Sequence, residues 1–153
     1  MNTRPQRLQK GDTVGIVSPS SPPDRQNLEN SLAFLEQLGL KWKFATHAKN
    51  IHGYLAGTDD ERLADLEEMF QDPEVKAIIC SSGGYGAGRI TDRLDMTLVE
   101  EHPKIFWGFS DITFLHTAIR QYTNLVTFHG PMLGPNVGAD TFEALSGKMF
   151  QQL

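Results

Sequence analysis

Residues 75–89 read VKAIICSSGGYGAGR, and this stretch carries the signals that decide the fold class. Val75 to Cys80 is a short apolar run, which is typical of a buried strand. It is followed at once by two serines and then by four glycines within the six positions 83–88. The pattern predicts a strand that opens at its carboxyl end into a glycine-rich loop.

The same alternation of strand and helix patterns continues on both sides of this stretch. Short apolar runs predict strands over residues 14–17, 40–44, 75–80, 105–107 and 125–128. Apolar residues at helical spacing, together with start and stop signals, predict helices over residues 28–38, 58–71, 97–101, 111–122 and 141–150. Lysines alternate with apolar residues only in the second strand, which we therefore expect to lie half exposed at a sheet edge.

Several residues mark the ends of these elements. Gly39 occupies the position expected for a helix C-cap, and Thr58 to Glu61 has the form of a capping box. Asp72-Pro73 is expected to stop the second helix. Gly130 to Ala139 contains three glycines and two prolines, which predicts a linker or surface loop.

Strands that alternate with helices predict an α/β fold in three α/β/α layers. We expect a mostly parallel sheet of about five strands, flavodoxin-like or class I amidotransferase-like, with right-handed crossovers. The length of 153 residues suits one domain.

Composition narrows the class of protein. Fourteen Lys and Arg against nineteen Asp and Glu give a net charge of −5, which disfavours nucleic-acid binding. The single cysteine, Cys80, excludes an intrachain disulfide and a cysteine-based zinc site. There is no apolar run of the roughly 18 residues that a membrane span needs, and no apolar signal-peptide core. We therefore expect a soluble, cytoplasmic protein without nucleic-acid or membrane partners.

The glycine loop after residue 80 is the first candidate for chemistry. Its glycines let the backbone approach a ligand closely and turn N–H groups towards an anion. The loop lacks the Gly-Lys-Ser/Thr of a P-loop, and its spacing is not G-x-G-x-x-G after the first strand. The alternative is a flexible turn into a helix.

The second candidate is Gly108-Phe109-Ser110-Asp111, where the fourth strand meets the next helix. A serine on such a turn is raised out of the sheet, and N–H groups at the helix start can stabilise an oxyanion. Ile112 replaces the second glycine of G-x-S-x-G, which disfavours an ordinary α/β-hydrolase. The alternative is that Ser110 only caps the helix. Together, the serine and the glycine loop are positioned to converge on one carbonyl.

Several linked motifs resemble the N-terminal domain of the LD-carboxypeptidase family, which includes murein tetrapeptide carboxypeptidases and microcin C immunity carboxypeptidases. The resemblance covers nearly the whole chain. Its motifs are Lys10–Ser20, Gly53–Asp59 with Arg62, Gly83–Gly86 with Arg89 and Leu94-Asp95, Pro103-Lys104 leading to Gly108–Thr113, and Thr127–Pro131.

The resemblance implies roles for particular residues. Ser110 would be the nucleophile, and the backbone N–H groups of Asp111 and Gly84 would form the oxyanion hole. The loop from Gly83 to Tyr85, including Gly84, would help to hold the terminal carboxylate of the substrate. Many relatives have Arg where this chain has Ser82, so a bidentate carboxylate or phosphate partner is lost and the exact substrate stays open.

The activity implied is removal of the terminal D-alanine from a muropeptide tetrapeptide in peptidoglycan recycling, through an acyl-enzyme and without a metal or organic cofactor. The His and Glu of the triad lie on a second, C-terminal domain in this family. We therefore expect residues 1–153 to be the nucleophile-bearing half of a two-domain enzyme, inactive as an isolated fragment. We also expect its uncovered cleft to favour self-association, for example as a homodimer.

None of the five histidines is expected to replace the missing base. His116 lies about 600° around a helix from Ser110, and His102 lies at the opposite end of the fourth strand. His47 and His52 follow the second strand and would at best line a cleft. His129 is the best rival, because it lies beyond the fifth strand next to the predicted site, and we expect it to be structural or substrate-lining.

Three alternatives stay open. An immunity-type enzyme that cleaves a peptidyl-nucleotide is compatible with Ser82. A flavodoxin-like, non-catalytic binding module would need a Gly/Thr-rich loop after the first strand, where Ser18 to Pro23 has three prolines instead. A non-enzymatic interaction domain would not depend on Ser110 at all.

Overall fold

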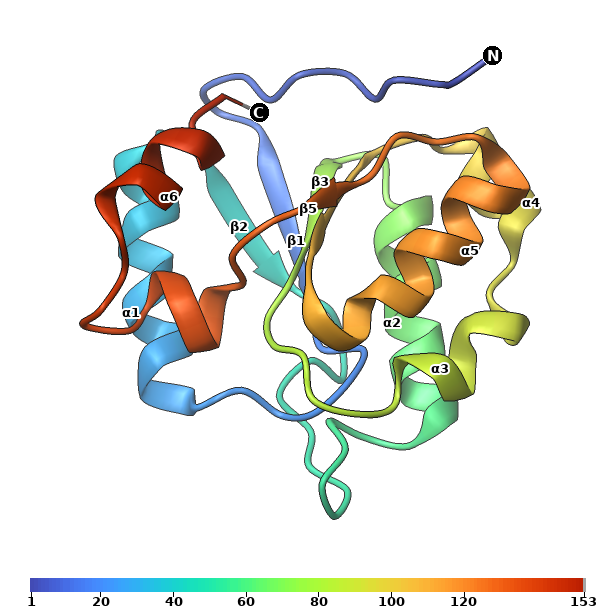
Figure 1. Cartoon of the computed structure of the whole chain (residues 1–153), viewed down its shortest axis with the longest axis horizontal. Coiled ribbons are helices and arrows are strands. Elements are labelled where there is room, and N and C mark those ends of the chain that lie inside the picture. Colours follow the sequence, from blue (N-terminus) through green and yellow to red (C-terminus); the bar gives the residue numbers. More distant parts are fainter. Residues whose placement is uncertain (153) are drawn as a thin grey trace.

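The computed structural model describes residues 1–152 and shows a sheet of five parallel strands (Figure 1). The strands follow the order β2-β1-β3-β4-β5, which is the flavodoxin-like order. They comprise β1 (Thr13–Val17), β2 (Lys41–Phe44), β3 (Val75–Cys80), β4 (Ile105–Gly108) and β5 (Phe128–His129). The expected parallel α/β architecture is therefore confirmed, and β2 is the half-exposed edge strand.

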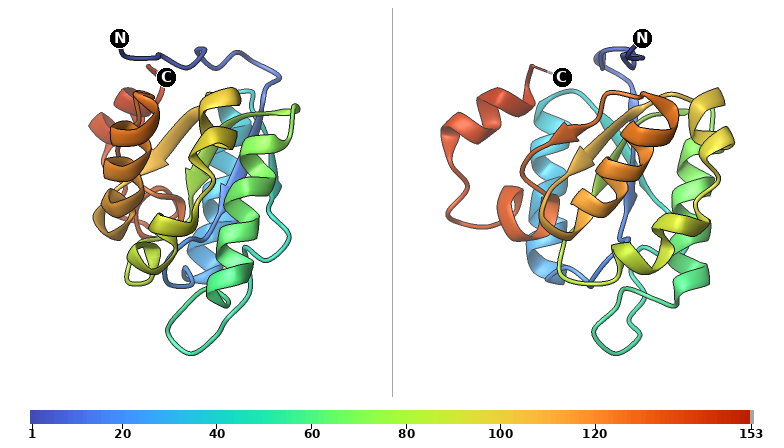
Figure 2. Two further views of the ribbon diagram at one scale, coloured as in Figure 1. Left: turned by 90° about the vertical axis from the view of Figure 1, so that its right-hand side faces the viewer. Right: turned by 45° about the vertical axis from the view of Figure 1, so that its right-hand side comes forward.

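Helices cover both faces of the sheet (Figure 2). One face carries α2 (Asp59–Gln71), α3 (Ala87–Ile90), α4 (Met96–Glu101) and α5 (Thr113–Thr123). The other carries α1 (Arg25–Gln37), the π-helical turn η3 (Leu133–Val137) and α6 (Ala144–Phe150). Two 3₁₀ turns, η1 (Thr91–Arg93) and η2 (Ser110–Ile112), precede α4 and α5. None of the described helices combines the length and the hydropathy that a bilayer crossing requires.

The central strands contribute to two apolar cores. Along β3, Ile78 and Cys80 face the α2 and α5 side, whereas Ala77 and Ile79 face the α1 side. All four side chains are fully buried. A strand covered on both faces reads as a continuous apolar run, which is why residues 77–80, after the exposed Lys76, show no alternation.

The local signals for helix ends act as expected. The Thr58 hydroxyl accepts from the Glu61 N–H at 3.2 Å, and the Glu61 carboxylate accepts from the Thr58 N–H at 2.8 Å. Gly39 adopts φ +76° after α1, and the Leu40 N–H reaches the Leu35 carbonyl at 3.1 Å. This is a Schellman arrangement, in which glycine satisfies carbonyls that the helix end leaves free.

Three element boundaries were wrong, and the first is the start of α1, which lies at Arg25 rather than 28. The strand expected over 125–128 is reduced to Phe128–His129, because Leu125 instead forms a parallel bridge with Thr3 near the N-terminus. The Val126 N–H donates to the Thr3 carbonyl at 2.8 Å. The last helix begins at Ala144 rather than 141.

The prediction of a linker over 130–139 was also wrong, because this segment is packed against α1. Leu133, Gly134 and Val137 are buried within η3. A Cβ added at Gly138 would lie 1.6 Å from the Asn27 carbonyl oxygen. The glycine here permits close contact between two backbones, which the composition alone does not distinguish from flexibility.

Gly138→Ala is therefore expected to destabilise the protein by about 3 kcal/mol or more, because backbone atoms must move to admit the methyl group. The matched control is Gly147→Ala in α6, where the new Cβ would meet only ordinary contacts from 3.5 Å outwards. That variant is expected to be neutral or stabilised by up to about 1 kcal/mol. Chemical denaturation of both variants checks the prediction, and equal stabilities would contradict it.

Candidate active site

Three loops meet where the strands end. Because β1, β3 and β4 are parallel neighbours, their carboxyl ends lie at one edge of the sheet, the lower edge in Figure 1. The loops begin at Ser18 after β1, at Ser81 after β3 and at Phe109 after β4. The site therefore combines segments that are up to 91 residues apart in the sequence.

Ser110 is the strained residue of this edge. Its φ is +60°, a left-handed value that only one other described non-glycine residue, Asn124, adopts. Such a backbone costs about 1–2 kcal/mol for a residue with a Cβ. Ser110 is exposed, and neither η2 nor α5 has a side-chain cap, so capping does not explain the strain. The turn lifts the hydroxyl out of the sheet.

The glycine loop passes directly beside this serine. A Cβ added at Gly83 would lie 3.1 Å from the Ser110 Cβ and 3.3 Å from its Oγ. Gly84 adopts φ +105°, and its N–H donates to no acceptor in the described part of the chain. Asp111 is the second residue of η2, so its N–H belongs to the group that a helix start leaves unpaired. The structure thus brings the serine and the loop together as expected.

The loop after β1 is hydrogen-bonded to the glycine loop. The Ser21 N–H donates to the Gly83 carbonyl at 3.0 Å, and the Tyr85 N–H donates to the Ser21 Oγ at 3.2 Å. At Gly84, an added Cβ would lie only 2.3 Å from that Oγ. A side chain at position 84 would therefore displace Ser21 and the loop that it holds.

The Asp111 carboxylate ties all three loops together. Its Oδ2 accepts from the Ser20 hydroxyl at 2.6 Å and from the Ala87 N–H at 2.9 Å. This carboxylate oxygen is therefore occupied by contacts with the first loop and with the start of α3. The backbone N–H of Asp111 takes no part in these contacts.

The buried guanidinium of Arg62 is a second group that links these loops by hydrogen bonds. Arg62 donates to the Pro19 carbonyl at 2.5 Å and to the Gly86 carbonyl at 2.8 Å, and it also pairs with Asp59. It therefore joins the first loop to the glycine loop. Burial lowers the pKa of Arg62, and the Asp59 carboxylate opposes that shift.

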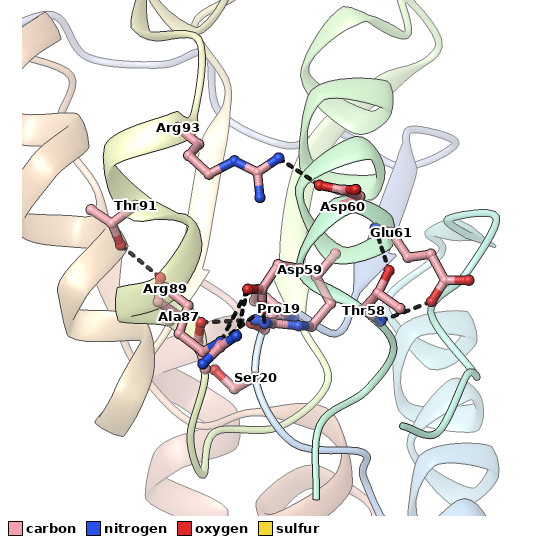
Figure 3. Close-up of polar contacts among 12 residues, drawn as sticks. Pro19, Ser20, Thr58, Asp59, Asp60, Glu61, Ala87, Arg89, Thr91 and Arg93 are labelled. Atoms are coloured by element: carbon pink, nitrogen blue, oxygen red, sulfur yellow. Dashed lines mark hydrogen bonds and ion pairs between the residues drawn. The ribbon is translucent and has the colours of Figure 1, made fainter. Parts of the chain in front are cut away.

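Asp59 connects this buried cation to the surface (Figure 3). Its carboxylate accepts from Arg89 at 2.7 and 2.8 Å, and Arg93 pairs with the neighbouring Asp60. Hydrogen bonds from Arg89 and the charges of Arg89 and Arg62 hold the pKa of Asp59 below its usual range. The guanidinium of Arg89 is therefore already engaged by the Asp59 carboxylate.

An open groove leads away from the serine. It has a volume of about 450 Å³ and runs from Ser110 along the outer face of α5, past the exposed side chains of Phe114 and Tyr122. The serine is thus accessible from this side.

The histidines lie close to the places expected for them, except that His129 belongs to β5 and does not lie beyond it. His129 pairs with Gly108 of β4 and is exposed, whereas His116 is buried and donates to the Gly108 carbonyl. His102 lies at the opposite end of β4, and His47 is bound by Asp65. No group of three or more His, Cys, Asp or Glu in residues 1–152 is placed to hold a metal.

Sequence reasoning missed the residues that support the site. Ser20 and Ser21 carry no recognisable spacing signal, because their side-chain partners, Asp111 and Tyr85, are 91 and 64 residues away, respectively. Arg62 occurs in a motif, but a polar residue on a helix gives no sign of complete burial. The family resemblance assigns a role only to the backbone N–H of Asp111, not to its carboxylate.

Comparison with known proteins places this site in context. Residues 14–130 match the family model described as "LD-carboxypeptidase N-terminal domain". The Bacillus subtilis (strain 168) protein "Probable murein peptide carboxypeptidase" is 58% identical over 153 residues, which are 100% of this chain and 48% of that protein.

Two solved structures are similar over almost the whole chain. The MccF-like protein from Bacillus anthracis str. Ames has a TM-score of 0.93 and 36% identity, covering 98% of this chain and 46% of the other. The microcin C7 self-immunity protein MccF in complex with aspartyl sulfamoyl adenosine has a TM-score of 0.92 and 28% identity, covering 97% and 45%. The chain spans about half the length of the relatives that it matches.

The strain at position 110 gives a testable prediction. Ser110→Gly is expected to raise the free energy of unfolding by up to about 1 kcal/mol relative to Ser110→Ala, because glycine adopts φ +60° without the Cβ penalty. Denaturant unfolding of the two variants measures the difference. If Ser110→Gly is the less stable variant, the backbone at this position is not strained.

Proposed function

Because the chain belongs to the LD-carboxypeptidase family, as its N-terminal domain, we propose that it is the nucleophile-bearing half of a serine carboxypeptidase that acts on murein peptides. The proposal rests mainly on the geometry of Ser110, an exposed serine with a left-handed backbone that faces the glycine loop. Its Cβ and Oγ lie 3.1 and 3.3 Å from the position that a Cβ added to Gly83 would occupy. A serine in this setting matches the strained nucleophile turns of hydrolases.

In the proposed reaction, the Ser110 oxygen attacks the carbonyl before the terminal D-alanine, while a base takes the hydroxyl proton. The N–H groups of Gly84 and Asp111 donate to the oxyanion that forms. The C–N bond then breaks, the D-alanine nitrogen receives the proton, and an acyl-enzyme is left on Ser110. Water hydrolyses this ester and restores the serine.

The base and its orienting carboxylate are proposed to come from a further domain. His116 is buried with one ring nitrogen bound to a backbone carbonyl, and Asp111 is engaged by Ser20 and Ala87. We propose neither as the base, because the unbound Nδ1 of His116 is buried and the Oδ2 of Asp111 already accepts two hydrogen bonds. A protein twice this length, like the relatives, has room for one more domain carrying a His and a Glu.

Binding of the substrate is assigned to the glycine loop. The backbone from Gly83 to Tyr85 is proposed to hold the terminal carboxylate, because its N–H groups offer donors without a competing side chain. Ser82 supplies a hydroxyl where a guanidinium would bind a carboxylate in two places. We expect weaker electrostatic attraction of the substrate at this position.

A peptidyl-nucleotide is the second candidate substrate. It is favoured by the similarity to the MccF structure that contains aspartyl sulfamoyl adenosine, at a TM-score of 0.92. The same serine and oxyanion donors would serve that reaction, and only the group bound beside them would differ.

The proposal is tested in the full-length protein with Ser110→Ala. We expect the release of D-alanine from a murein tetrapeptide to fall by about 10³-fold or more, because no nucleophile is left. Ser146→Ala, in α6 on the other side of the sheet, is the matched control and should keep wild-type activity. Cleavage of aspartyl sulfamoyl adenosine, measured in parallel, identifies the better substrate. Undiminished activity in Ser110→Ala would refute the serine mechanism.

A second prediction concerns the described chain by itself. Residues 1–153 alone are expected to show negligible turnover of the tetrapeptide, because general-base assistance is missing. The assay compares this chain with the full-length protein at equal concentration. Robust turnover by the short chain would show that the base lies within it.

A further inference from the structure

His116 makes an unusual contact next to the proposed nucleophile. Its ring lies buried on α5, and Nε2 is 2.8 Å from the Gly108 carbonyl oxygen. Since a carbonyl only accepts, Nε2 carries the hydrogen and Nδ1 keeps a lone pair in the neutral ring. Nδ1 is buried and has no hydrogen-bond partner among residues 1–152. Burial lowers the pKa of His116, which favours this neutral form.

The contact closes a short segment of chain around Ser110. Gly108 ends β4, and His116 lies on the first turns of α5, so their hydrogen bond spans the whole strand-to-helix turn. The same carbonyl also accepts from the Gly130 N–H at 3.2 Å. Two donors therefore fix the peptide plane two residues before the serine.

The position of the ring is itself constrained. Phe106 packs edge-to-face against it with 5.4 Å between ring centroids, and the His129 ring lies 6.2 Å away. A buried ring held in this way has little rotational freedom. It therefore transmits the position of α5 to the end of β4.

The turn needs such a restraint. A serine at φ +60° tends to relax towards negative φ, and this relaxation would carry its hydroxyl away from Gly83. Displacements of about 1 Å at a reacting group lower rates by roughly 10²-fold. A hydrogen bond that closes the turn opposes this relaxation.

We propose that His116 is a positioning residue, which holds the Gly108 carbonyl and so keeps Ser110 in its strained, reactive conformation. It acts through the backbone and exchanges no proton with substrate. The inference rests on the proposed function for its effect on rate, but its effect on the backbone at Ser110 is independent of any activity.

The kinetic test uses the full-length protein with His116→Phe and His116→Gln. Phenylalanine fills the space without a donor, and we expect kcat for tetrapeptide hydrolysis to fall by 10–100-fold with KM changed by less than about threefold. Glutamine offers an amide N–H and is expected to recover most of kcat. The matched control is His102→Phe, because His102 Nδ1 also lies 3.0 Å from a carbonyl, that of Leu98, at the far end of β4. Its kcat should be unchanged.

The kinetic outcomes separate the possible roles. A kcat for His116→Phe within threefold of wild type would overturn the proposal. Loss of a limb of the pH–rate profile in His116→Gln would also overturn it, since that result identifies a proton-transfer group. A uniform fall at every pH with rescue by glutamine supports it. Activity that survives Ser110→Ala would instead refute the proposed function. In that case, the thermal unfolding experiment described next decides whether His116 restrains the backbone at Ser110.

Thermal unfolding tests the coupling without any substrate. Ser110→Gly is expected to raise Tm in the wild-type background, where the strain is held in place. In His116→Phe the strain has already relaxed, so Ser110→Gly should leave Tm unchanged. An equal rise in both backgrounds would contradict the proposal. If His116→Phe does not fold, the smaller His116→Ala replaces it in both experiments.

Discussion

The close approach of the Gly83 backbone to Ser110 is the constraint on which the site depends. At 3.1 Å between the position of a Gly83 Cβ and the Ser110 Cβ, a side chain at position 83 would make an unusually tight contact and require the serine to shift by a few tenths of an ångström. The serine can face the loop only because its own backbone is left-handed. The absence of a side chain at Gly83 and the left-handed backbone of Ser110 together allow this close contact, and the sheet brings the two residues together because β3 and β4 are parallel neighbours.

Buried polar groups stabilise this arrangement without taking part in it. The Arg62 guanidinium joins Pro19 to Gly86, and the Asp111 carboxylate joins Ser20 to Ala87. Each group binds backbone or hydroxyl partners on two different loops. Arg62 is buried and Asp111 is partly buried, and hydrogen bonds are electrostatically stronger away from water. The loops therefore behave as one rigid unit. That rigidity preserves the N–H groups proposed to stabilise the oxyanion.

Local patterns predicted the elements well where a single segment carries the signal. The apolar run at residues 75–80, the capping box at Thr58 and the glycine after α1 needed no tertiary information. They failed where the partner is distant. Leu125 pairs with Thr3 rather than extending β5, and the glycines of 130–139 serve contact with α1 rather than flexibility.

The sequence by itself determined the α/β architecture, the turn serine and the glycine loop. These features depend on periodicity, caps and motifs, which are formed by residues that are close together in the sequence. Only the tertiary structure decided that Ser110 is strained, that the Asp111 carboxylate accepts from Ser20, and that His116 donates to the Gly108 carbonyl at the end of β4. These facts depend on which loops the parallel sheet places side by side. Contacts across 60–90 residues leave no spacing pattern in a single chain, since folding alone brings their atoms within hydrogen-bond distance.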